Sequence, residues 1–554
     1  MIEASAKGLV FATGVVSYLI YKRFEPSGVI ASLMLLVVLP GVVLNTVRGQ
    51  FPNIILAWTS VYFGYWLVLV SLTIGYRLSP FHPLALFPGP TLCKASKLWM
   101  VYKVAQGGSH QYHRALHKRY GDVVRTGPNE LSFRHEGAIA PLYKDSKKGP
   151  YYDTRQTANV EQLDGIKDLT EYARRRKGWN RGMSMAALKG YEDMLRKVIV
   201  ELTAALEKRQ DEPLNLRLWL IYAAFDFMGE IVFTRNFNSV KTASDVTGMI
   251  HGIDDASSQL ACIAQIPWTM PFLSFIQKVF GEQGSWKLLQ KAATETVRKR
   301  VEDGTGKRDL FHYIMDGDDL EQVKPPLEEV ASEGGLAIVA GSDTTAVTLS
   351  HVFYFLLCHP PCMERLHKEV GSQYPGATDT MSDFARHADM PYLNACVNEA
   401  MRLYPAVLTG SQRTINSGQG GAMLGPYYVP DGTNASVNLF SLQRDPRHFY
   451  PLPDEFWPDR WLTQDTYRLP TGDVISKEEL IHDKSVFLPF ATGIRSCVGK
   501  NLAILEMRAV LCALIQKFDF SVAPGYDLAS WEREVRNIFI TACGPLMVNV
   551  KSRY

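Results

Sequence analysis

The sequence predicts a helical membrane anchor followed by a soluble domain in which helices are combined with a smaller β region. Three apolar stretches without internal charge fill most of residues 8–76, as is typical of membrane-spanning helices. Beyond them, apolar residues recur with helical spacing in residues 215–237, 286–302 and 326–358. Residues 120–133 instead have the pattern of strand, turn and strand.

The composition is that of a folded protein with an apolar excess. Hydrophobic residues make up 46% of the 554 residues and charged residues 21%, which is within the globular range. The net charge of +3 is too small to predict a nucleic-acid-binding surface. The eight cysteines show neither the spacing of a disulfide framework nor paired zinc-ligand motifs. We therefore expect reduced cysteines, most of them in the core.

Residues 1–78 are predicted to form the membrane anchor, with spans at 8–21, 27–47 and 54–76. The first span is short for a full crossing, so the anchor has two or three transmembrane helices. Basic residues follow the first and third spans, at Lys22, Arg23 and Arg77, whereas only Arg48 separates the second from the third. The positive-inside rule places the two richer groups, and hence the body of the protein, in the cytosol.

A proline-rich stretch at residues 79–90 links the anchor to a large domain at residues 91–554. Prolines fix φ and remove backbone donors, so this stretch is predicted to be a stiff hinge rather than a helix. Within the domain, the polar, lysine-rich residues 144–149 predict a surface loop.

One cysteine, Cys497, lies between Gly493 and Gly499 late in the chain. The glycines allow backbone turns and close approaches that a side chain would obstruct. Residues 501–515 are strong helix formers without proline or glycine. The cysteine is therefore expected just ahead of a helix N-terminus, where the amide dipoles favour a thiolate.

Two further side chains belong to this loop. Arg495 can hold an anionic group beside the sulfur, and Phe490 can shield the sulfur from water. The pattern Phe-x-x-Gly-x-Arg-x-Cys-x-Gly resembles the haem-binding signature of the cytochrome P450 family, with every specified position present. The resemblance implies that Cys497 is the axial thiolate ligand of a haem iron. It places Phe490, Gly493, Arg495 and Gly499 in the haem site.

The predicted helix at 326–358 carries polar residues in the middle of an apolar run. Asp343 and Thr344 follow Gly341, and a buried acid is costly unless it is hydrogen-bonded. A threonine hydroxyl can bond a carbonyl one turn back and open the helix beside a glycine. From these residues alone, a kinked core helix without chemistry is also possible. The segment resembles the oxygen-activation motif of the P450 family, which implies that Asp343 and Thr344 supply protons as a general-acid relay.

Glu399 and Arg402 are spaced to pair on one face of a helix that ends before Pro405. An exposed pair of this kind contributes little to stability. The spacing also resembles the Glu-x-x-Arg helix of the family, in which a later Pro-x-Arg segment completes a buried network. Arg460 matches that later arginine, so these three residues are expected to be structural.

Two more arginines match family positions that bind a haem propionate. Arg176 lies four residues after Tyr172, where the family usually has Trp or His. Arg413 matches an arginine on a strand. An ordinary solvated helix face and an ordinary strand-surface arginine are the alternatives.

The resemblance covers roughly residues 88–554, and the spans ahead of the body resemble those of some membrane-anchored fungal members. It implies a cytochrome P450 fold, mainly α with a smaller β region, in one large domain. It also implies a haem-dependent monooxygenase that inserts one oxygen atom from dioxygen into a hydrophobic substrate. The chain has no Gly-x-Gly-x-x-Gly dinucleotide fingerprint, so electrons are expected from a separate NADPH-cytochrome P450 reductase. A basic face near Arg174, Arg175 and Lys500 is the predicted docking surface.

By the same resemblance, five apolar positions line the substrate pocket: Ala337, Ala340, Val407, Leu408 and Phe539. They suit a terpenoid or an aromatic secondary metabolite reaching the site from the membrane, with the protein multi-pass in the endoplasmic reticulum. Two alternatives remain open. One is a haem-thiolate isomerase or dehydratase, and the other is a haem-binding membrane protein without catalysis.

Overall fold

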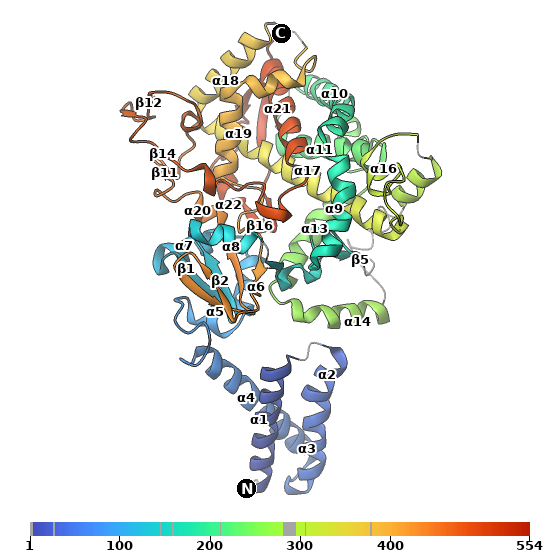
Figure 1. Cartoon of the computed structure of the whole chain (residues 1–554), viewed down its shortest axis with the longest axis vertical. Helices are drawn as coiled ribbons and strands as arrows, with labels where there is room; N and C mark the ends of the chain where they lie inside the picture. The colour runs from blue at the N-terminus through green and yellow to red at the C-terminus, as the bar shows by residue number, and fades with distance from the viewer. Residues whose placement is uncertain are drawn as a thin grey trace.

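The computed structural model describes residues 4–25, 28–144, 146–157, 160–210, 212–280, 295–304, 306–376 and 379–554. A slender helical anchor carries a much larger body, and the chain ends on the side of the body far from the anchor (Figure 1). The body is mainly helical with several small sheets, which confirms the predicted fold class. Of the predicted helix at 286–302, residues 295–302 are helical and the preceding residues lie outside the described ranges.

The anchor helices are α1 (Ala4–Phe24), α2 (Val29–Leu33), a π-helical turn (Met34–Val38), α3 (Leu39–Val47) and α4 (Ile54–Leu78). Two segments are long and apolar enough to cross a membrane, Val29–Gln50 and Ile54–Leu78, at the positions predicted for the second and third spans. The π-helical turn interrupts the regular α-helical hydrogen bonding, so some backbone carbonyls there can accept hydrogen bonds from other groups. Tyr62 and Tyr65 of α4 satisfy two of them, with 2.8 and 2.6 Å hydrogen bonds to the carbonyls of Val37 and Leu35.

The first apolar segment is also helical and packs along α4. Gly14 lies against Val68, and Gly64 faces Val10, so small residues on both helices permit close approach. The residue numbers of the contacting pairs increase along both helices in the same direction, so α1 and α4 are parallel. The two helices therefore run side by side towards the body. α2 and α3, which lie between them in the sequence, run in the opposite direction (Figure 1).

The proline-rich connector contains turns but no helix. It is packed against the body, because Leu84 is fully buried and the Pro88 carbonyl accepts a hydrogen bond from the Arg125 amide. Phe81 and Leu86 are instead largely exposed beside the anchor. The connector thus fixes the body to the anchor and leaves apolar side chains where the two parts meet.

Two long helices form the centre of the body. α17 (Leu327–Cys358), at the predicted position, packs against α11 (Leu216–Phe233). It also contacts α19 (Pro391–Leu403) and α21 (Lys500–Lys517). Most of α11 and the C-terminal half of α17 are buried, so α17 is a core helix despite a hydropathy that would permit a membrane span. α17 therefore has packed neighbours on several sides.

Smaller helices surround this core. They are α5 (Thr91–Ala95), α6 (Leu98–Ala105), α7 (Ser109–Tyr120), α8 (Ile139–Tyr143), α9 (Leu169–Gly182), α10 (Met185–Glu207), α12 (Ser239–Thr242), α13 (Met249–Ile263), α14 (Met270–Phe280), α16 (Leu310–Ile314), α18 (Pro360–Gln373), α20 (Leu439–Leu442) and α22 (Ser530–Glu534). In Figure 1, α14 lies at the end of the body that faces the anchor.

The largest sheet has the strand order β1-β2-β10-β7-β3. Its strands are β1 (Val123–Gly127), β2 (Glu130–Phe133), β10 (Asn434–Val437), β7 (Arg413–Thr414) and β3 (Lys147–Lys148). The antiparallel β1–β2 pair confirms the predicted hairpin. The prediction of a surface loop at 144–149 was wrong for Lys148, which is buried because β3 pairs with β7 opposite Arg413.

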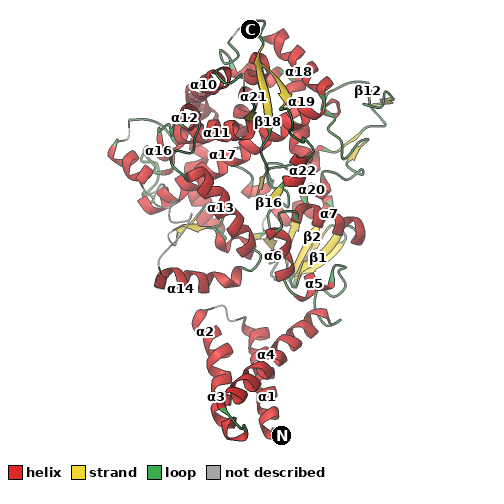
Figure 2. Cartoon of the chain, turned by 180° about the vertical axis from the view of Figure 1, so that it is seen from behind, coloured by secondary structure: helices red, strands yellow, loops and turns green. Residues whose placement is uncertain are grey.

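A second sheet pairs β15 (Phe518–Val522) with β18 (Met547–Ser552) and β6 (Leu214–Asn215). The two sheets lie at opposite ends of the body, with β1 and β2 nearest the anchor (Figure 2). The remaining strands form pairs: β16 (Arg536–Ile538) with β17 (Ile540–Ala542), β4 (Gln156–Thr157) with β5 (Val160–Glu161), β8 (Gly421–Leu424) with β9 (Tyr427–Pro430), β11 (Phe449–Tyr450) with β14 (Ile481–His482), and β12 (Thr466–Arg468) with β13 (Val474–Ser476).

A buried ion network ties α19 to the segment before the cysteine loop. Arg402 approaches both carboxylate oxygens of Glu399, at 2.8 and 2.9 Å, and Arg460 Nε lies 3.0 Å from Oε1. All three side chains are essentially inaccessible to solvent. Burial acts to raise the pKa of Glu399, but Arg402 and Arg460 outweigh it and hold that pKa at about 2. The geometry excludes the alternative of an exposed helix-surface pair.

Candidate active site

A cavity of about 330 Å³ lies between the cysteine loop, α17, α21 and the β16–β17 turn. Cys497 and Thr344, which belong to different predicted motifs, both line it. Most of the other lining side chains are apolar. The structure therefore brings the cysteine and the threonine of α17 to one enclosed, largely apolar space.

The cysteine loop is shaped by backbone geometry that requires glycine. Gly493 has a φ of +76°, and a Cβ at this position would collide with the carbonyl oxygen of Tyr143. The Cys497 amide donates a 2.9 Å hydrogen bond to the carbonyl of Phe490, which closes the loop. α21 begins at Lys500, three residues after the cysteine, as the sequence predicts.

The Cys497 thiol faces the cavity, and Phe490 and Gly499 also line the cavity beside it. Burial raises the pKa of Cys497, whereas the Gly499 amide, Arg176 and Lys500 act to lower it. The groups that favour a thiolate are thus present around the sulfur. A bound metal cation would add to them.

Three buried cations gather next to the loop without a carboxylate at ion-pair distance among the described residues: Lys148, Arg413 and Arg495. Arg495 donates to the carbonyls of Ile166 and Lys167, and its Nε has no hydrogen-bond partner in the described part of the chain. The Nε of Arg413 is likewise without a partner there. Burial, followed by Arg413, lowers the pKa of Lys148 well below its usual range.

Such a cluster is costly to bury unless an anionic group binds beside it. A haem ligated by Cys497 would bring two carboxylates, so the cavity, the thiol and the unpaired cations fit that cofactor. Of these three cations, Arg495 lines the cavity, whereas Lys148 and Arg413 do not. Arg176 has polar partners of its own. It donates hydrogen bonds to Asn180 and to the Tyr172 hydroxyl and does not line the cavity. Tyr172 is buried, and Arg495 packs over its ring at 4.4 Å.

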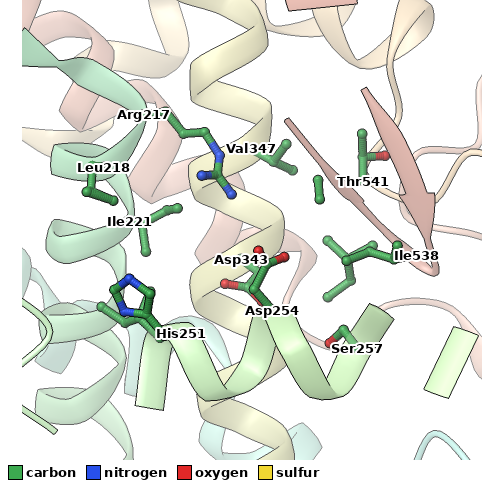
Figure 3. A pocket seen from close by; sticks show the side chains of 13 residues that line it. Arg217, Leu218, Ile221, His251, Asp254, Ser257, Asp343, Val347, Ile538 and Thr541 are labelled. Carbon is green, nitrogen blue, oxygen red and sulfur yellow. The ribbon is translucent and has the colours of Figure 1, made fainter. Parts of the chain in front are cut away.

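The two polar residues predicted on α17 face different spaces. The Thr344 hydroxyl donates a 2.7 Å hydrogen bond to the Ala340 carbonyl and lines the main cavity, while the helix continues without a break. Asp343 instead points into a second cavity of about 130 Å³, towards Asp254 and Arg217 (Figure 3). Burial raises the pKa of Asp343 to about 7; Arg217 opposes this rise and Asp254 adds to it.

Four of the five apolar positions predicted for the substrate pocket line the main cavity: Ala337, Ala340, Val407 and Phe539. Leu408 does not line it and is fully buried in the core. Phe539 has a φ of +83°, an uncommon value for a bulky residue, at the tip of the β16–β17 turn. This turn directs the aromatic ring into the cavity.

Sequence reasoning missed two residues near the site. Lys148 was hidden in a lysine-rich segment, and its burial depends on strand pairing that is not visible locally. Glu506 lies on α21, lines the main cavity, and interacts with the Thr345 side chain. Burial raises the pKa of Glu506 well above its usual range. An acid inside an apolar helix was the available signal, the same one that identified Asp343.

The basic run on α9 is largely neutralised. Arg174 forms ion pairs with Glu171 and Glu329, and Arg175 pairs with Glu171, Glu329 and Glu333. The side chain of Arg175 is only 11% exposed, so it is poorly placed for a docking partner. Lys500 remains exposed beside the cysteine loop.

Comparison with known proteins identifies a family for the part of the chain that contains this cavity. A family model described as Cytochrome P450 matches residues 88–544. A cytochrome P450 monooxygenase of Eupenicillium brefeldianum is 31% identical over 496 residues, covering 88% of this chain and 94% of the relative. A cytochrome P450 monooxygenase of Fusarium pseudograminearum (strain CS3096) is 33% identical over 472 residues, covering 82% and 79%. A trichothecene C-15 hydroxylase of Fusarium sporotrichioides is 30% identical over 482 residues, covering 85% and 94%.

Proposed function

This chain belongs to the cytochrome P450 family, and on that premise we propose that it is a membrane-anchored haem-thiolate monooxygenase acting on a hydrophobic substrate. The observation that carries the proposal is the shared cavity of Cys497 and Thr344. The thiol and the threonine come from segments more than 150 residues apart in the sequence, and the space between them is mainly apolar. That arrangement suits a cofactor held by the thiol, with an apolar substrate in the same cavity.

Cys497 would hold the haem iron, and Arg413, Arg495 and Lys148 would pair with its carboxylates. Arg176 does not line the cavity and would act on the thiolate through its positive charge. When bound, the haem supplies dioxygen activation, and thiolate ligation favours cleavage of the O–O bond. Phe490 lines the cavity beside the sulfur, and Gly493 allows the loop to pass close to the Tyr143 carbonyl.

Asp343 and Thr344 would handle protons. The Asp343 carboxyl holds a proton near neutral pH, because its pKa is raised to about 7 by burial. The Thr344 hydroxyl, fixed by the Ala340 carbonyl, is placed to orient a proton donor in the main cavity. Asp343 and Thr344 are adjacent on α17, and each of them lines one of the two cavities.

The apolar lining supports a hydrophobic substrate, such as a terpenoid or an aromatic secondary metabolite. One relative is named a trichothecene C-15 hydroxylase, which supports hydroxylation at a carbon atom. Electrons would come from a separate NADPH-cytochrome P450 reductase on the face that exposes Lys500. The anchor supports a multi-pass location in the endoplasmic reticulum with the domain at residues 91–554 in the cytosol.

The test is oxygen consumption and product formation by the full-length protein in microsomes with reductase and NADPH, fed with candidate terpenoids and aromatics. We expect NADPH- and reductase-dependent oxygen uptake and a product heavier by one oxygen atom. Incorporation of label from ¹⁸O₂ would show the source of that atom. Turnover of a substrate without oxygen uptake would instead identify an isomerase or dehydratase.

A further inference from the structure

Basic side chains gather where the anchor meets the body. Lys22 lies in the last turn of α1 and Arg77 in the last turn of α4. Lys94 lies on α5, and Arg125 lies on β1. We call these four side chains the junction cations. None of them has a carboxylate oxygen within 4.0 Å in the described part of the chain. The function proposed above gives them no role.

Contacts across the junction hold this region together. The Arg77 guanidinium donates a 2.8 Å hydrogen bond to the carbonyl of Ala95, the last residue of α5. Lys22 Nζ lies 3.8 Å from the centroid of the Tyr76 ring, and that ring packs against the His82 ring with 5.2 Å between the centroids. The end of α4 therefore joins the end of α1 to the connector and to α5.

Arg125 is the most deeply buried of the junction cations. It is 1% exposed, and its Nε and Nη2 both donate to the Pro128 carbonyl, at 3.1 and 2.8 Å. A neutral carbonyl leaves the buried positive charge uncompensated, which is costly inside a protein. Burial, followed by the charge of Arg77, lowers the pKa of Arg125 to about 10. Burial, followed by the charge of Arg125, likewise lowers the pKa of Lys94.

An acid on the same sheet is already engaged. Glu130 lies on β2, where it is 2.6 Å from Lys97 and also accepts hydrogen bonds from the side chains of Thr126 and Gln412. Burial lowers the pKa of His82 to about 4, and the charges of three junction cations act in the same direction. These cations therefore act together on one buried ring, and a bound anion would compensate them.

Large apolar side chains are exposed at the same junction. On the connector, Phe81 is 85% exposed and Leu86 is 96% exposed, and Leu92 and Leu98 are exposed on α5 and α6. Clustered apolar side chains of this kind are typical of a surface that contacts a membrane. When α4 spans a bilayer, its end at Leu78 places this region at the level of the lipid headgroups. Basic residues at this level attract the anionic lipids of the cytoplasmic leaflet.

We propose that the junction cations form a binding site for the headgroup of an anionic phospholipid, which supplies the missing counter-charge between the anchor and the body. A guanidinium such as that of Arg77 binds phosphate through paired N–H donors, and an ammonium such as that of Lys94 binds it as a point charge. The inference is independent of the oxygenation chemistry, because no junction cation lines either of the two cavities described above.

The test is native mass spectrometry of the full-length protein in detergent, titrated with phosphatidylserine or with zwitterionic phosphatidylcholine of the same acyl chains. We expect the wild type to bind phosphatidylserine more tightly than phosphatidylcholine. Lys22→Gln and Lys94→Gln should each weaken phosphatidylserine binding roughly five-fold, as for the loss of one cation near a lipid headgroup. Both variants should leave phosphatidylcholine binding unchanged, and added salt should reduce the preference of the wild type.

Arg48→Gln is the matched control. Arg48 is an exposed anchor cation ahead of α4, at the opposite end of that helix from Arg77, and it too has no carboxylate within 4.0 Å among the described residues. This variant should bind phosphatidylserine as the wild type does. Circular dichroism should show the same helix content in all variants, so that a change in lipid binding reports on the site and not on unfolding.

Equal binding of the two lipids by the wild type would overturn the proposal, and so would an equal loss of phosphatidylserine binding in Arg48→Gln. Inorganic phosphate separates a lipid site from a site for a free anion. We expect it to leave bound phosphatidylserine in place at equal concentration. Displacement of the lipid under that condition would show that the junction cations bind free phosphate, and the lipid assignment would be wrong.

Discussion

At Gly493 the backbone has a φ of +76°, and the space next to its Cα is filled by the Tyr143 carbonyl oxygen. Gly525 has nearly the same φ, +77°, but no atom lies within 4 Å of the place a Cβ would occupy. The two glycines therefore separate the cost of the backbone conformation from the cost of a collision. They form a matched pair for mutagenesis.

We expect Gly525→Ala to lower the free energy of unfolding by about 1–2 kcal/mol, which is the strain of an L-residue at positive φ. Gly493→Ala should cost more and should also reduce haem content, because the collision displaces the loop that carries Cys497. The measurements are thermal unfolding and the haem-to-protein ratio of purified protein. Equal losses in both variants would show that the Tyr143 contact does not shape the loop.

The glycines, the cysteine and the phenylalanine of this loop could be predicted from the sequence because they act within ten residues of one another. The orientation of Asp343 could not, since it depends on α13 and α11 packing against α17. Lys148 was missed for a similar reason, because only the register between β3 and β7 places it beside Arg413. Local patterns identified the chemistry, whereas long-range packing decided which cavity each residue faces.

Among the elements, α19 depends most clearly on one buried carboxylate. Glu399 accepts from Arg402, Arg460 and the Trp461 indole, at 2.8–3.0 Å. Arg402 also donates to the backbone carbonyls of Gln443, Pro453 and Glu455. Removing the carboxylate would leave two buried guanidinium groups without their shared counter-charge.

Glu399→Gln is expected to lower the free energy of unfolding by about 3–5 kcal/mol, the usual cost of breaking a buried pair. Glu364→Gln is the control, because Glu364 forms an exposed pair with Lys368 on α18 and should change stability by less than about 1 kcal/mol. Thermal unfolding of both variants measures the difference. A small loss in Glu399→Gln would mean that the network orients α19 without stabilising it.

The same network predicts an acid-sensitive step. The pKa of Glu399 in the folded protein is about 2, below the usual 4.5, so its ionised form stabilises the fold. This contribution is fully present above pH 4.5 and is lost as the pH falls towards 2. The acid loss of stability between these values should therefore be smaller in Glu399→Gln than in the wild type, as measured by unfolding at a series of pH values.

At the scale of the whole molecule, the packing of the anchor helices predicts how the body is oriented at a membrane. α1 and α4 are parallel, and Lys22 at the end of α1 lies 3.8 Å from the Tyr76 ring near the end of α4. The C-terminal ends of α1 and α4 therefore lie at the same end of the anchor. The sequence alone left the first span undecided, because its length was marginal while its partner helix was unknown.

We expect α1 to cross the membrane, which places the N-terminus opposite the catalytic body. A glycosylation acceptor added at the N-terminus should be modified in microsomes, and so should one inserted at Arg48–Gln50 between α3 and α4. An acceptor inserted between α1 and α2 should remain unmodified. An unmodified N-terminus together with a modified site at Arg48–Gln50 would show that only two helices cross.

The proposed function of the whole chain depends on the sulfur of Cys497. Whether this sulfur ligates a haem iron is the most direct test of that function. The full-length protein, reduced and exposed to carbon monoxide, should show the red-shifted Soret band of a thiolate-ligated haem. Cys497→Ala should lose that shift, whereas Cys543→Ala, at a buried cysteine outside the cavity lining, should keep it. A wild-type band without the shift, or a shifted band that survives Cys497→Ala, would contradict the assignment.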